Sequence, residues 1–67
     1  MSVAKVIEIT ASSPTSFEDA IKSGIERAGK RLEKVEGAWI QEQKVVVDNN
    51  CITEYRVNMK VTFVLND

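Results

Sequence analysis

The sequence predicts one α+β domain over residues 1–67, in which the elements follow the order β-α-β-β. Three observations predict this fold. The C-terminal end alternates between apolar and polar residues, the first half carries an apolar stripe at helical spacing, and an Asp-Asn-Asn turn separates two strand-like segments. Such a chain forms a three-stranded antiparallel sheet in spatial order 1-3-2, packed on one helix.

The first predicted strand covers residues 3–10, and a helix follows it. Thr15 with Glu18 has the spacing of a helix capping box. Ser16 with Asp19 is an equal candidate for the same role. Both pairs place the start of the helix in the same turn. The sequence does not decide whether Thr15 or Ser16 is the capping residue.

The predicted helix presents one apolar stripe to the sheet. Glu36 and Gly37 are its predicted exit. Gly24 and Gly29 lie inside it, where glycine costs about 1 kcal/mol relative to alanine. Either a close helix contact justifies this cost or nothing does. The stripe consists of Phe17, Ile21, Ile25, Ala28 and Leu32.

The two remaining strands form a predicted hairpin over residues 38–48 and 55–65. The turn between them contains Asp48, Asn49 and Asn50, residue types that tolerate positive φ. The last strand has one apolar face and one mostly polar face, which is typical of a half-buried strand. Its apolar positions are Tyr55, Val57, Met59, Val61, Phe63 and Leu65.

The chain direction places the third strand in the centre of the sheet. If the helix runs back along the first strand, the first two strands point the same way and the third opposes both. One helix covers only one face of such a sheet. Because domains of this size need disulfides, metals or oligomerisation to be firmly stable, we expect the chain to associate with copies of itself.

The composition excludes several classes of function. The formal net charge of −1 gives no electrostatic basis for binding nucleic acid or an anionic membrane. No apolar run approaches the ~20 residues that span a bilayer, and no signal peptide is visible. Histidine is absent, which removes the usual general base and histidine metal sites, so we expect no enzyme. Cys51 stands alone, as in reduced cytoplasmic proteins, and its role is unassigned.

Two residues stand out as candidates for ligand binding. Trp39 and Ile40 are neighbours on one strand and so lie on opposite faces of the sheet; one of them faces away from the helix, as an interface or rim residue. Across a twofold axis, two copies of Trp39 would sandwich a planar ligand. Arg56 lies on the polar face of the last strand, where it would form an ion pair or bind an anionic ligand. No metal ligands can be assigned.

Nearly the whole chain resembles the dodecins. The resemblance rests on Val6-Ile7-Glu8-Ile9, on residues 12–17, on residues 25–28 and on residues 55–65, in the same β-α-β-β order. It implies a hollow homododecamer. It also implies a non-enzymatic protein that binds and stores a small ligand, a flavin (FMN, riboflavin or FAD) in the best-known members.

The resemblance weakens at the flavin site. Flavin-binding members stack a Trp of the second strand on the isoalloxazine ring and hydrogen-bond its polar edge with a Gln of the third. Ungapped alignment places Gly37 at the Trp position and Arg56 at the Gln position. Trp39 lies two residues further on, a shift of about 6–7 Å along the same face. Arg56 offers donors only, so it does not reproduce the pattern of Gln.

Relatives without the stacking Trp, with Arg in place of Gln, have been linked with calcium, and this chain resembles that branch more closely. We therefore expect a small ligand or ion to be sequestered without the standard flavin sandwich. Flavin storage through Trp39 and Arg56 is the alternative, and a purely structural shell or interaction protein is a further one.

Overall fold

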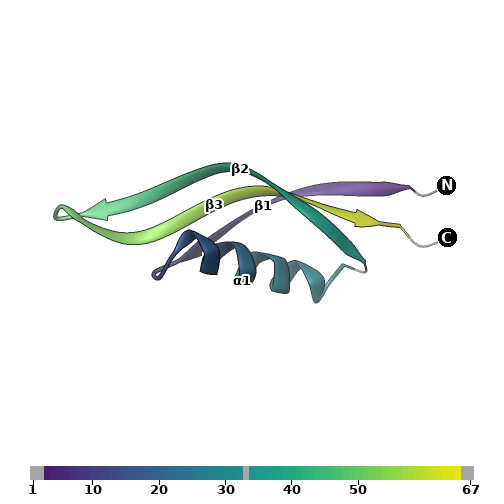
Figure 1. Cartoon of the computed structure of the whole chain (residues 1–67), viewed down its shortest axis with the longest axis horizontal. Coiled ribbons are helices and arrows are strands. Elements are labelled where there is room, and N and C mark those ends of the chain that lie inside the picture. The colour runs from purple at the N-terminus through teal and green to yellow at the C-terminus, as the bar shows by residue number, and fades with distance from the viewer. Residues whose placement is uncertain (1–2, 33, 66–67) are drawn as a thin grey trace.

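A computed structural model describes residues 3–32 and 34–65 of the chain. Its elements are β1 (Ala4–Ser13), α1 (Phe17–Gly29), β2 (Val35–Asp48) and β3 (Cys51–Val64). The strands form one antiparallel sheet in the order β1-β3-β2, and α1 lies along one face of it (Figure 1). The predicted fold class is confirmed. The single domain over 1–67 stays a prediction, and residues 1–2 and 66–67 lie outside the described residues.

The predicted helix exit at Glu36 and Gly37 is wrong. α1 ends at Gly29, and the chain makes one more tight turn in which the Leu32 backbone N–H donates to the Ala28 carbonyl. β2 then begins at Val35, which pairs with Phe63, so Glu36 and Gly37 belong to the strand. Pairing with β3 and packing of Val35 on the core outweigh a further helical turn.

The hairpin between β2 and β3 is longer than predicted. Its two-residue loop is Asn49-Asn50, with φ angles of 53° and 63°, so both residues are left-handed as a type I′ turn requires. The predicted turn is confirmed. β3 already begins at Cys51 rather than Tyr55, because the tight loop lets pairing start at once with Asp48 opposite Cys51.

Ser16 caps α1 at its N-terminus. Its hydroxyl accepts a hydrogen bond of 3.0 Å from the backbone N–H of Asp19. The Asp19 carboxylate does not reach back to Ser16; it accepts a 2.7 Å bond from Ser13, whose hydroxyl also accepts from the Thr15 N–H. The two predicted capping candidates are thus resolved in favour of Ser16, and Ser13 ties the end of β1 to the first turn of the helix.

The core lies between α1 and the centre of the sheet. Gly24 allows this close approach, since a Cβ there would collide with the Met59 methyl group and lie 3.0 Å from the Ala11 Cβ. Gly29 has nothing within 4 Å of an added Cβ, so no packing reason explains it. Among the residues that the structure describes, the fully buried apolar ones are Ala20, Val57, Met59 and Val61.

The molecule is elongated, with extents of 51 × 19 × 13 Å. α1 covers only the middle of the sheet, and the β2–β3 hairpin extends beyond the start of the helix (Figure 1). Phe17, the first residue of α1, contacts Tyr55 edge-on at 5.1 Å between ring centroids, which marks where helix cover ends. In the part of the chain that the structure describes, no helix could cross a bilayer.

Candidate functional site

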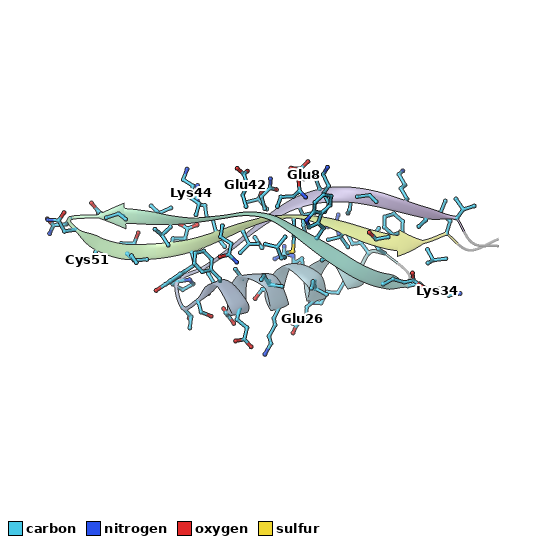
Figure 2. All side chains as sticks on the ribbon, turned by 45° about the horizontal axis from the view of Figure 1, so that its top comes forward. Glu8, Glu26, Lys34, Glu42, Lys44 and Cys51 are labelled. Atoms are coloured by element: carbon cyan, nitrogen blue, oxygen red, sulfur yellow. The ribbon has the colours of Figure 1, made fainter. Side chains whose placement is uncertain are left out.

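The candidate site lies on the outer face of the sheet, which is the face opposite α1. Val57, Met59 and Val61 are buried against the helix side, so the alternating residues Arg56 and Lys60 point away from it. Figure 2 shows Glu8, Glu42 and Lys44 on this side, from β1 and β2. Three strands thus contribute charged side chains to one uncovered surface.

A shallow depression of about 480 Å³ occupies the centre of the outer face. Its lining contains acidic and basic side chains and several side-chain oxygen atoms that can act as ligands to a cation. Its described lining residues include no aromatic ring. This surface is therefore better suited to bind a small polar ligand or an ion than to stack on the flat ring system of a flavin. The lining residues are Thr10, Glu42, Gln43, Lys44, Arg56 and Asn58.

Asn58 forms hydrogen bonds to two β1 side chains at the side of the depression nearest β1. Its amide nitrogen donates to the Glu8 carboxylate at 2.8 Å, and its amide oxygen accepts a 3.4 Å bond from the Thr10 hydroxyl. Glu42 is the register partner of Asn58 on the other side. Carboxylates of Glu8 and Glu42 therefore flank Asn58 from two strands.

Arg56 forms an ion pair within its own strand. Its Nε donates to the Glu54 carboxylate at 3.0 Å, and both side chains are partly exposed. The hydrogen bond from Arg56, and after it that from Ser12, holds the pKa of Glu54 below its ordinary value of 4.5. The ion pair leaves part of the guanidinium facing the depression, which Arg56 also lines.

Trp39 faces away from α1, and Ile40 packs against the core, so the two neighbours lie on opposite faces as predicted. The Trp39 side chain is 67% exposed. The Lys60 ammonium lies 5.8 Å from the centre of its ring. The ring is thus available for stacking and has one cation beside it.

One chain does not bring the three predicted site residues together. Gly37 pairs with Thr62 and Trp39 pairs with Lys60, toward the end of β3 that is remote from the hairpin loop. Arg56 lies opposite Lys44, nearer the loop, and is the only one of the three that lines the depression. Whether they bind a ligand stays a prediction.

One chain also lacks a preformed metal centre in the residues that the structure describes: no group of three His, Cys, Asp or Glu side chains could hold an ion. Asp48, Asn49 and Asn50 are accounted for by the hairpin turn. Cys51, a free thiol, is exposed beside this turn. A calcium ion would need oxygen ligands in addition to those that one outer face gathers.

These features define a small α+β binding protein with an uncovered sheet face. The sequence model of the dodecins matches residues 3–66, and the chain belongs to the dodecin family. Dodecins bind or store small molecules and are not enzymes, so the protein is a non-enzymatic binding protein.

Relatives and solved structures agree with this assignment. A calcium dodecin from Mycobacterium tuberculosis is 38% identical over 63 residues, which cover 94% of this chain and 89% of the relative. A crystal structure of that calcium dodecin, described as having a novel calcium-binding site, superposes with a TM-score of 0.84 at 34% identity, covering 96% and 91% of the two chains. A dodecin from Streptomyces davaonensis gives a TM-score of 0.94 at 29% identity, with 98% and 97% covered.

Sequence reasoning missed the central depression. It did not single out Glu8, Thr10, Glu42 or Asn58, which lie far apart in the sequence and become neighbours only through the strand register. A signal was present in the polar positions of β3, but the bulge between Ile40 and Glu42 shifts the β2 partners by one residue.

Proposed function

We propose that this chain is a homododecameric binding protein of the cytoplasm that sequesters a small ligand or an ion without the standard flavin sandwich. One feature of the sequence carries the proposal: ungapped alignment places Gly37 at the position where flavin-binding members have the stacking Trp. An added Cβ at Gly37 would meet nothing within 4 Å, so neither a side chain nor a neighbouring group fills that place in the chain.

Arg56, which aligns with the flavin-binding Gln of the family, supports the same conclusion. Arg56 is engaged with Glu54, and it lines a polar depression rather than an aromatic slot. A guanidinium donates hydrogen bonds and accepts none, so it attracts a carboxylate, a phosphate or a carbonyl oxygen. The ligand class favoured by this surface is small, polar and oxygen-rich.

A titration with riboflavin or FMN tests the proposal. We expect flavin fluorescence to remain essentially unquenched when the protein is present at equal concentration. Strong quenching at near-stoichiometric protein would contradict it. In that case Trp39→Ala would identify the stacking residue, because loss of binding in this variant would establish the alternative in which Trp39 and Arg56 hold the flavin.

Calcium is the second candidate, favoured by the carboxylates of Glu8 and Glu42 on either side of Asn58. Because one chain lacks three clustered acidic ligands among its described residues, the ion would lie where outer faces of several copies meet. Calorimetric titration of the assembled protein with Ca²⁺ should then give fewer ions than chains. Glu42→Gln should abolish this binding, and Glu26→Gln on the helix should not.

A further inference from the structure

A groove of about 610 Å³ lies between α1 and the free edge of β1. Its lining includes Ile9, which packs toward α1, and Ser12, which alternates with that face, so the groove follows the edge of the strand. Along β1 it extends from Ile7 to Ser12, a distance of about 17 Å at the rise of a strand. A volume of this size falls within the range of about 300–1,000 Å³ that is typical of small-molecule sites.

The floor of the groove is apolar and open to solvent. Gly24 leaves room in it because glycine has no side chain. The other floor residues are only half-buried, so burying them under an apolar chain would be favourable. These residues are Ile7, Ile9, Ala11, Ala28 and Leu32.

Arg27 and Arg31 are the two charged residues of the groove lining. Arg27 lies in the last turn of α1, and Arg31 lies in the tight turn that follows, where its backbone N–H donates to the Ala28 carbonyl at 3.1 Å. The spacing of four residues brings the two side chains to the same side of the helix. Neither forms an ion pair with any residue of the described ranges 3–32 and 34–65.

We propose that this groove binds a single anionic amphiphile of the fatty-acid class, with its alkyl chain on the apolar floor and its carboxylate at Arg27 and Arg31. The ligand is an anion because both charged residues of the lining are cations, and a guanidinium binds a carboxylate through two parallel N–H donors. It carries an alkyl chain because a sugar or an inorganic anion would leave the floor uncovered. The site is distinct from the depression on the outer face, with which it shares only Thr10 among the lining residues.

Calorimetric titration of the purified protein with decanoate tests the proposal. The extended chain of decanoate is shorter than the groove, and the titration stays below its critical micelle concentration. We expect saturable binding that is at least about tenfold tighter than that of hexanoate, because decanoate buries more methylene groups. Decyltrimethylammonium has the same alkyl chain and a cationic head, and should bind at least about tenfold more weakly than decanoate. Absence of saturable decanoate binding, as when another copy of the chain covers the groove, would overturn the proposal, and so would equal affinities for the two head groups.

A matched pair of charge variants tests the arginines. Arg27→Gln/Arg31→Gln should lower the affinity for decanoate at least about tenfold, because hydrogen bonds to a charged group are lost. Lys22→Gln/Lys30→Gln makes the same change of charge on helix residues outside the groove lining, and should retain the affinity within about twofold. Equal losses in the two variants would assign the effect to net charge and overturn the proposal. Circular dichroism verifies that both variants fold.

Methyl NMR locates the bound ligand. Decanoate should shift the methyl signals of Ile7, Ile9 and Leu32, which line the groove, and leave that of Val47 on the β2–β3 hairpin unchanged. Shifts confined to methyl groups outside the groove would overturn the proposal.

The variant Glu42→Gln separates this site from the one proposed above. Glu42 lines the depression on the outer face and not the groove, so the variant should bind decanoate like the wild type. Loss of decanoate binding in this variant would place the ligand on the outer face and overturn the groove site. The titrations with flavin and Ca²⁺ decide the proposed function independently of this result.

Discussion

At the scale of single residues, Gly24 sets the distance between the helix and the sheet. Its Cα faces Met59, which is fully buried, and Ala11 on β1. Helix propensity alone would favour alanine at this position, so glycine is retained against a local preference. The two helical glycines therefore differ in their role: close packing requires Gly24, whereas no packing contact requires Gly29.

Gly24→Ala should destabilise the protein. Overpacking costs about 1–3 kcal/mol, and we expect this cost to exceed the gain of about 1 kcal/mol in helix propensity. Gly29→Ala is the matched control, because an added Cβ there meets nothing within 4 Å. We expect it to raise the free energy of unfolding by about 0.5–1 kcal/mol. Denaturant unfolding measures both changes, and a gain of equal size in the two variants would contradict the role of Gly24.

We expect the ionisation of Glu54 to make the stability of the fold depend on pH. Its pKa is lowered in the folded chain by the hydrogen bonds from Arg56 and Ser12. A lowered pKa means that the carboxylate stabilises the fold above its ordinary value of 4.5, and that this stabilisation disappears as the pH falls through the folded pKa. The difference in unfolding free energy between wild type and Glu54→Gln should therefore narrow as the pH decreases below this value. A constant difference from neutral to acidic pH would argue against the ion pair.

At the scale of elements, the start of α1 depends on Ser16. Ser16→Ala removes the acceptor of the Asp19 N–H and should cost about 1 kcal/mol. Thr15→Ala is the control, because the bond of Thr15 to Ser13 uses its backbone N–H and survives the substitution. Thermal unfolding distinguishes the two. Equal losses would mean that Thr15 shares the capping role.

The hairpin loop makes a second prediction at this scale. Asn50 has a φ of 63°, a region that β-branched residues avoid. Asn50→Val should cost about 1–3 kcal/mol, whereas Asn50→Gly yields the preferred Asn-Gly pair of a type I′ turn and should be neutral or stabilising. Denaturant unfolding, with proteolysis of the β2–β3 hairpin as a second readout, checks this order; a tolerated valine would contradict the type I′ turn.

Local patterns were sufficient to predict these elements and their order. The alternation in β3, the stripe of α1 and the Asn49-Asn50 turn each act over a few residues, and chain direction then fixed the sheet order. The end of α1 was not predictable in this way, because its position depends on pairing of Val35 with distant Phe63. The depression around Asn58 was missed for the same reason: register and bulges combine residues that no local pattern connects.

At the scale of the whole molecule, the chain has too little core for its length. Four apolar residues in the described part of the chain are completely buried, and the β2–β3 hairpin extends without helix cover in a body 51 Å long. Domains below about 70–80 residues rarely gain more than 3–5 kcal/mol from a single core. In the proposed dodecamer, contacts between copies would supply much of the stability, which would couple folding to assembly.

This coupling predicts a melting temperature that depends on protein concentration. Between micromolar and dilute samples, over about a hundredfold range, the wild-type Tm should fall because mass action favours dissociated chains. Val47→Glu/Ile52→Glu changes side chains that are exposed in the single chain, so it should leave the monomer fold intact while weakening assembly and reducing this dependence. Val6→Glu changes a similarly exposed valine (53%) that is remote from the β2–β3 hairpin loop, and this variant should keep the concentration dependence of the Tm. A wild-type Tm that is unchanged by dilution, in a sample whose native mass is monomeric, would show that the small core suffices alone.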